Sequence, residues 1–264
     1  SRYRIKPLDS LRVSSQELMS FAGNEADTNL YGRMMKAIRT DHEIGNKVRM
    51  LKLPLILTDT QLYAGAIAQF YLLTKTLEEA LEQHKDHPMV AKALGLGYKV
   101  VPGYESDLEE LMGSDWRSLT DRACTTATAN YISILRSSTP SELVAASFIL
   151  YGALVIGGGK ATQKKVRRVF KGCEHKLFDI ADDMPKARKA FKDVFNTIGK
   201  EFPDQFDELV QHAARFMALN NTVVLSVRCL PFWWWQVALV SASLGVLAVA
   251  LRLKGTRPLA IASH

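Results

Sequence analysis

The sequence has few cysteines and no pattern that would pair them. Cys124, Cys173 and Cys229 are the three in 264 residues, and no Cys-x-x-Cys pair occurs. A disulfide framework needs an even set of cysteines at short spacings, and a structural zinc site needs ligands in close pairs. The sequence argues against both, and the thiols fit a reducing compartment or a buried, inert position.

Alternation of apolar and polar residues, the mark of half-buried β-strands, is also missing, and no internal repeat is found. A basic stripe interleaved with aromatic residues is missing as well, although the formal net charge is +7. Four of the positive charges flank a C-terminal apolar segment, namely those of Arg228, Arg252, Lys254 and Arg257. The modest excess on the rest of the chain is typical of a solvated surface, so we predict no nucleic-acid binding.

The sequence does carry a 3.6-residue apolar period from residue 29 to residue 226. The clearest helical segments are 62–84, 104–116, 141–155, 185–202 and 203–221. Residues 58–61 (TDTQ) form a capping signal before the first of them. Pro-Gly at 102–103 and the stretch 85–88 (KDHP) indicate loops. We therefore predict an all-α domain over residues 29–227.

A long uncharged stretch follows this domain. Residues 229–251 read CLPFWWWQVALVSASLGVLAVAL, without Asp, Glu, Lys or Arg. An apolar helix of about 20 residues spans the hydrocarbon core of a bilayer. Tryptophans 233–235 stand at one end and basic residues at the other, as at the two membrane interfaces. We predict a single-pass tail anchor with a short basic tail in residues 228–264.

The N-terminal segment 1–28 is basic, contains several serines and begins with Ser1. We expect it to be an N-terminal extension, either the remnant of a cleaved targeting presequence or a plain arm. The moderately hydrophobic anchor and its basic tail suit a mitochondrial membrane better than the endoplasmic reticulum, which is the alternative.

Three consecutive glycines, Gly157–Gly159, interrupt a segment that otherwise reads as helix. Each glycine inside a helix costs about 1 kcal/mol relative to alanine, so the run needs a reason. A phosphate loop is excluded, because GxxxxGK followed by Ser or Thr would need glycine at Leu154 and a hydroxyl at Ala161. Either the helix ends here, or it bends so that its backbone lies close to a flat ligand such as heme. Heme would need an axial ligand on its other face, usually histidine. Spacing alone singles out none of the six histidines.

The order of several motifs resembles that of the heme oxygenases. The matching pieces are AIRTDHEIGN (37–46), YLLTKTLEEAL (71–81), LMGSDW (111–116), ELVAASFILYGALVIGGGKATQKK (142–165) and FKDVFNTI (191–198). They occur in the family's order, and the hydrophobic C-terminal segment is similar to that of the animal members.

This resemblance implies a heme site. His42 is expected to be the proximal ligand of the heme iron, and Gly157 and Gly158 are expected to form the bend of the distal helix above the heme. Arg39 and Lys192 fall where basic residues approach the heme propionates, and cations are what those anionic groups call for.

The distal side departs from the family pattern. Tyr71 and Tyr151 fall on family positions near a distal water network. The family's distal aspartate, which orders the water beside iron-bound oxygen, is matched by Leu154. Four further polar positions of the family, a serine, two arginines and a lysine, are matched by Ile156, Leu150, Asn196 and Met35 respectively. Aliphatic side chains cannot order water or deliver protons, so oxygen activation should be impaired.

Two functions remain open. The aliphatic replacements favour a membrane-anchored protein that does not degrade heme. It would be a heme binder or an accessory subunit of a membrane complex, such as one of the mitochondrial respiratory chain. His42, Tyr71 and the glycine run favour an active heme oxygenase, which converts heme to biliverdin, CO and iron with O2 and electrons from a reductase.

Overall fold

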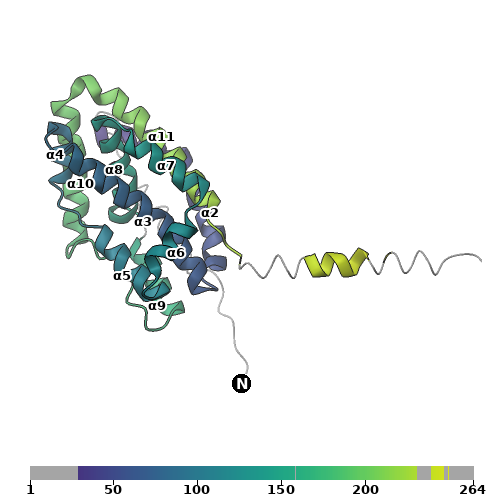
Figure 1. Cartoon of the computed structure of the whole chain (residues 1–264). Coiled ribbons are helices and arrows are strands. Elements are labelled where there is room, and N and C mark those ends of the chain that lie inside the picture. Colours follow the sequence, from purple (N-terminus) through teal and green to yellow (C-terminus); the bar gives the residue numbers. More distant parts are fainter. Residues whose placement is uncertain (1–28, 158, 231–238, 247–248, 250–264) are drawn as a thin grey trace, which may run out of the picture.

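A computed structural model of the protein describes residues 29–157, 159–230, 239–246 and 249, and all regular structure in these residues is helical (Figure 1). This confirms the predicted all-α class. The elements are α2 (Leu30–Ile56), α3 (Thr60–Gln83), α4 (Pro88–Leu94), α5 (Val101–Met112), α6 (Trp116–Ala123), α7 (Thr126–Arg136), α8 (Pro140–Val155), α9 (Gly159–Val169), α10 (Met184–Glu201), the 3-10 turn η2 (Pro203–Gln205) and α11 (Phe206–Ser226).

The starts of two central helices follow from local sequence. Asp59 caps α3 by accepting the backbone N–H groups of Gln61 at 2.7 Å and Leu62 at 3.2 Å, as the capping signal predicted. At α8, Thr139 and Glu142 form a capping box, in which each side chain accepts the other residue's backbone N–H. Such caps satisfy donors that the first turn of a helix leaves without partners.

Two helix boundaries differ from the prediction. The predicted helix 104–116 is two helices, because α5 ends at Met112 and Gly113 takes φ 77°, a left-handed conformation that glycine adopts at little cost. The Pro-Gly pair at 102–103, predicted as a loop, lies in the first turn of α5. Proline is tolerated there, since the N–H that it lacks would have no partner inside the helix.

The long helices α2 and α11 pack closely side by side. A β-carbon on Gly45 of α2 would lie 2.1 Å from Oδ1 of Asn221, so only glycine allows this approach. Asn221 Nδ2 donates to the carbonyl of Asp41 at 2.7 Å. The Lys52 amine donates to the carbonyls of Val224 at 3.1 Å and Val227 at 2.8 Å, so α2 also holds the end of α11.

The central helix of the core is α8, which is buried on nearly all sides. Its Phe148 ring stacks on Phe191 of α10 at 5.7 Å between ring centroids and meets Phe195 edge-on at 4.9 Å. A helix that is apolar all round belongs in a core. α8 therefore forms the centre against which α3, α4, α10 and α11 pack.

Within the described ranges, no single helix is long and apolar enough to cross a membrane. Only α8 and α9 taken together pass that test, and α8 is a buried core helix. Residues 231–238, 247–248 and 250–251 of the predicted anchor, 229–251, lie outside the described residues. Of that segment, residues 239–246 are helical, and their apolar side chains Leu239, Val240, Leu244 and Val246 are exposed. The predicted extension 1–28 and Gly158 also lie outside the described residues.

Candidate functional site

One side of α2 faces the junction of α8 and α9. Near the start of α2, Tyr31 packs edge-on against Phe148 of α8 with 5.8 Å between ring centroids. Further along, Arg49 Nη1 donates to Thr162 Oγ1 of α9 at 3.3 Å. Helical residues seven or eleven positions apart share a face. His42 is eleven residues after Tyr31 and seven before Arg49, so it lies on the side of α2 that faces this junction.

The imidazole of His42 is exposed and has no hydrogen-bond or ion-pair partner among the described residues. Partial loss of hydration lowers the pKa of His42, and the nearby Arg49 guanidinium lowers it further, while Glu43 acts in the opposite direction. The ring is therefore neutral at pH 7, with a nitrogen lone pair available. A neutral imidazole is the form that ligates metals.

Two cations lie on or near the His42 side of α2. The Lys192 amine of α10 lies 5.5 Å from the ring centroid of Tyr31. Arg39 is exposed one helical turn before His42. Asn196, on the same helix as Lys192, accepts the backbone N–H of Tyr31 at 3.1 Å and so joins α10 to the start of α2. The structure thus brings Lys192 to the Tyr31 end of the side that carries His42.

The glycine run bends a helix. α8 ends at Val155, α9 begins at Gly159, and their axes differ by 52°. The backbone N–H groups of Ile156 and Gly157 both donate to the carbonyl of Gly152, at 2.9 and 3.1 Å. A β-carbon on Gly157 would lie 2.3 Å from the Ala153 carbonyl oxygen, a distance that no side chain can occupy. Gly157 is thus required by the close turn of its own backbone.

The third glycine has a different reason. A β-carbon on Gly159 would lie 2.3 Å from the ring of Phe178, which comes from the segment between α9 and α10. Phe178 in turn stacks on His175 with 5.5 Å between ring centroids. Gly159 therefore admits an aromatic ring that packs beneath the start of α9.

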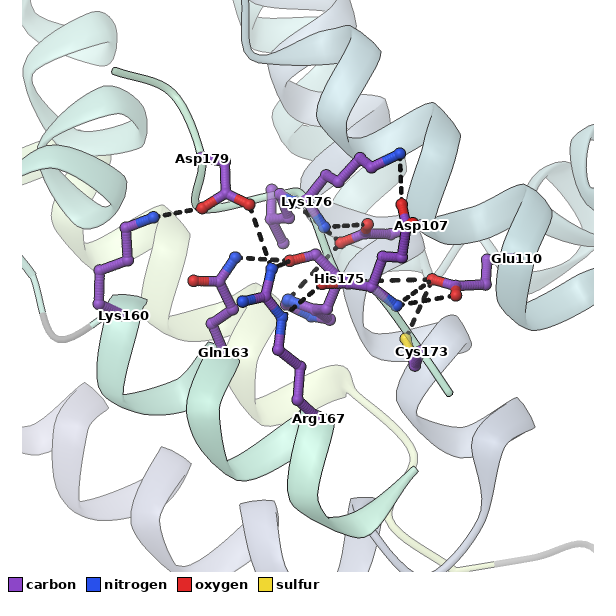
Figure 2. A network of polar contacts seen from close by, with 11 residues as sticks. Asp107, Glu110, Lys160, Gln163, Arg167, Cys173, His175, Lys176 and Asp179 are labelled. Carbon is purple, nitrogen blue, oxygen red and sulfur yellow. Dashed lines mark hydrogen bonds and ion pairs between the residues drawn. The ribbon is translucent and has the colours of Figure 1, made fainter. Parts of the chain in front are cut away.

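The segment that carries Phe178 is tied to one face of α9 (Figure 2). Gln163 Nε2 donates to the carbonyl of His175 at 2.6 Å, and Arg167 Nη2 donates to the same carbonyl at 3.3 Å. The Asp179 carboxylate pairs with both Lys160 and Arg167. Lys160, Gln163 and Arg167 lie on one face of α9 because their spacing is three and four residues.

The same segment is tied to α5 by two carboxylates, as Figure 2 also shows. Asp107 accepts the backbone N–H groups of Lys176 and, at 3.0 Å, Leu177. Glu110 accepts the backbone N–H of Glu174 at 2.8 Å. The residues 174–179 thus connect α5 to α9, and we call this set of contacts the α5–α9 network.

His175, at the centre of the α5–α9 network, is fully buried. The Tyr63 hydroxyl bonds its Nε2, and Asp107 Oδ2 lies 3.7 Å from its Nδ1. Burial lowers the pKa of His175 to about 4 and raises the pKa of Asp107 to about 6. The burial of His175 is not predicted by the sequence, because the charged run KGCEHK reads as a solvated loop and carries no apolar period.

A family model described as heme oxygenase matches residues 28–226. The chain belongs to the heme oxygenase family. Heme oxygenase 1 of the cyanobacterium Synechocystis is 24% identical to it over 200 residues, which cover 73% of this chain and 82% of that protein.

Solved heme oxygenases share the fold. Heme oxygenase 2 from Chlamydomonas reinhardtii, determined without heme, is 26% identical with a TM-score of 0.70, covering 77% of this chain and 99% of that one. Heme oxygenase-2 from Synechocystis, solved with heme and NO, is 20% identical with a TM-score of 0.65, covering 88% and 95% of the two chains.

Within this heme oxygenase fold, the two predicted distal tyrosines have partners on other elements. The Tyr71 hydroxyl donates to Glu105 of α5 at 3.0 Å, and its ring meets Trp116 of α6 at 5.4 Å between centroids. Tyr151 is buried and meets Tyr98 edge-on at 6.0 Å. None of these described contacts joins either tyrosine to the His42 side of α2, and their part in a distal water network stays a prediction.

The aliphatic residues predicted at the distal positions are part of the core. Leu150 and Leu154 are each 5% exposed, and Ile156 is half-buried against the same cluster. Packing of this kind favours leucine, because a carboxylate or guanidinium placed there would lose its hydration. These positions are therefore apolar both in residue type and in surroundings.

Proposed function

We propose that this protein binds heme between α2 and the α8–α9 bend, with His42 as the axial ligand, and does not open the ring. The observation that carries the proposal is that the His42 side chain is accessible and has no partner in the part of the chain that the structure describes. Its imidazole is exposed and neutral, has no partner among the described residues, and lies on the side of α2 that faces the bend.

The cations on the side of α2 that carries His42, and the bend that this side faces, fit a heme. Arg39 and Lys192 supply cations for the two propionates, and charge-assisted contacts of this kind are stronger than neutral ones. The bend at Gly157 presents backbone without a β-carbon, so a flat ring can lie close to it. When bound, heme supplies an iron that a neutral imidazole can ligate.

The distal side supports binding without ring opening. Oxygen activation needs protons that are delivered by hydroxyl groups, carboxylates or ordered water at hydrogen-bond distance. The positions that supply them in the family are the buried, aliphatic Leu150 and Leu154 here. Side chains of this kind suit an apolar ring face and offer no group that could order the water on which turnover depends.

An active heme oxygenase is the second candidate. The bend at Gly157 and the family membership favour it, because a working enzyme needs the same approach of backbone to heme. The two candidates differ in the fate of bound heme.

The test uses the full chain in detergent, titrated with hemin while the Soret band is recorded. A reductase with NADPH, or ascorbate, is then added in air, and biliverdin and released iron are measured. We expect a saturable band that persists, with no biliverdin. Stoichiometric biliverdin with iron release would overturn the non-degrading function, and the absence of a saturable band would overturn heme binding.

We also propose that residues 229–251 anchor the domain in a membrane, with the mitochondrial membrane as the site. There the protein would act as an accessory subunit beside respiratory-chain components. The uncharged, tryptophan-flanked sequence of this segment supports anchoring. Extraction of isolated mitochondria with alkaline carbonate tests it, since an anchored chain stays in the pellet and a peripheral one is released.

A further inference from the structure

An apolar stripe on α2 has no covering partner among the described residues. Its members are Ile44, 49% exposed, Leu51, 76% exposed, and Leu55, 43% exposed. Spacings of seven and four residues place all three on one face of the helix. Single exposed apolar residues are ordinary, but three aligned on one helix face form a patch of the kind that marks an interaction surface.

This stripe lies away from the candidate heme site. Ile44 follows His42 by two positions, which is a rotation of about 200° around the helix. The two features therefore occupy nearly opposite sides of α2. An occupant of the stripe would not cover His42.

The stripe lies beside the end of α11. The Lys52 amine, next to Leu51 in sequence, donates to the carbonyls of Val224 and Val227. Leu225 of α11 is itself 57% exposed. The apolar surface therefore continues from α2 onto the last turn of α11, and Figure 1 shows the end of α11 beside α2.

The chain leaves little distance between this surface and the predicted anchor. Val227 and Arg228 are the two residues between Ser226, where α11 ends, and Cys229, where the uncharged segment starts. An extended chain spans at most about 3.5 Å per residue, so the three steps from Ser226 to Cys229 reach about 10 Å. With the segment anchored as proposed, the end of α11 and the stripe beside it would lie near the membrane.

We propose that Ile44, Leu51 and Leu55 of α2, with Leu225 of α11, rest on the lipid bilayer beside the anchor. Helix faces with apolar residues and basic neighbours lie in the headgroup region, where the basic side chains meet anionic lipids. Lys47 and Arg228, both exposed, are positioned for that role. The inference rests on the membrane anchoring proposed above. In this orientation the side of α2 that carries His42 stays accessible to solvent.

The test reconstitutes the full chain into phosphatidylcholine vesicles that contain an anionic phospholipid and a photoactivatable phospholipid probe. After illumination, lipid adducts are mapped on peptides by mass spectrometry. We expect adducts on residues 44–55 and on 229–251, and none on α5. Adducts on 229–251 alone would overturn the bilayer contact of α2 and point to a partner protein on the stripe. Absence of adducts from both, in a chain that does not float with the vesicles, would overturn the anchoring itself.

A matched pair of variants sharpens this test. Leu51→Glu places a charge on the stripe at a position that is 76% exposed, so the fold should persist. Val169→Glu makes the same kind of change on α9, where Val169 is 46% exposed. We expect Leu51→Glu to reduce adducts on 44–55 to the level of α5 while those on 229–251 persist, and Val169→Glu to change neither. Equal adduct yields on 44–55 in both variants would contradict the proposal, provided that their helical circular dichroism matches that of the native chain.

Discussion

Two parts of the molecule contact α9 on different sides, the side of α2 that carries His42 and the segment that carries His175. On one flank, Thr162 contacts Arg49 on the side of α2 that carries His42. On the other flank, Gln163 and Arg167 hold the carbonyl of His175. His42 is exposed and without a partner among the described residues, whereas His175 is fully buried and bonded to Tyr63.

The difference shows that surroundings, rather than residue type, decide what a histidine does. A neutral, accessible imidazole can take a ligand, and a buried one with a fixed hydrogen bond can only hold structure. In this fold, the flank that we assign to heme carries the imidazole of His42, which has no partner among the described residues. The other flank fixes α9 through the α5–α9 network.

The largest expected effect on stability comes from removing part of the α5–α9 network on the buried flank. Asp107→Ala removes the acceptor of two backbone N–H groups, those of Lys176 and Leu177. Unsatisfied buried donors cost about 1–3 kcal/mol each, so the free energy of unfolding should fall by about 2–6 kcal/mol. Urea denaturation of the full chain in detergent measures it. Asp59→Ala, which loses only a helix cap, is the control and should cost about 1 kcal/mol. Equal losses for the two variants would show that the α5–α9 network adds no stability of its own.

The second prediction concerns the bend between the two flanks. In Gly157→Ala the new methyl group would lie 2.3 Å from the Ala153 carbonyl, so the bend must open at a cost of about 2–3 kcal/mol. In Gly152→Ala the methyl group would meet only the Phe191 ring at 3.5 Å. That control should gain stability, by up to about 1 kcal/mol, because alanine is the better helix former. Thermal unfolding compares the stabilities of the two variants. If Gly157→Ala left the stability unchanged, the bend would not need glycine.

The third prediction concerns the opposite effects of pH on stability that His175 and Asp107, the two buried groups, produce. The neutral form of His175 is favoured in the fold, so its contribution is complete above pH 6.5 and is lost as the pH falls through about 4. The protonated form of Asp107 is favoured, so its contribution is complete below pH 3.8 and is lost as the pH rises through about 6. Between pH 4 and 6 the two effects oppose each other.

Single variants should reveal each slope. Asp107→Asn leaves the His175 effect, and the free energy of unfolding should fall on acidification between pH 6.5 and 4 by up to about 1.4 kcal/mol per pH unit. His175→Gln leaves the Asp107 effect, and stability should rise as the pH falls from 6 to 4. Urea denaturation at a series of pH values measures both slopes. Two parallel pH profiles would show that these residues do not titrate as described.

The all-α fold could be predicted from the sequence, and the buried flank could not, while the role of His42 on the exposed flank stays a prediction. The 3.6-residue period predicts the helices and the glycine run indicates the bend, because both signals are local. His42 came from the order of the family's motifs. Asp107 and His175 both lie in charged runs that look solvated, and their burial depends on contacts between segments about 70 residues apart, such as that of Leu177 with Asp107. The break at Gly113 was missed because a left-handed glycine has no periodic signature.

The central claim is that His42 ligates heme on the open flank of α9. Resonance Raman spectroscopy of the ferrous heme complex of the full chain tests it most directly, through the iron–histidine stretching band. We predict that the native chain and His175→Gln show this band, that His42→Ala lacks it, and that added imidazole restores five-coordinate ligation in His42→Ala. An unchanged iron–histidine band in His42→Ala would contradict the account, because another residue would then hold the iron.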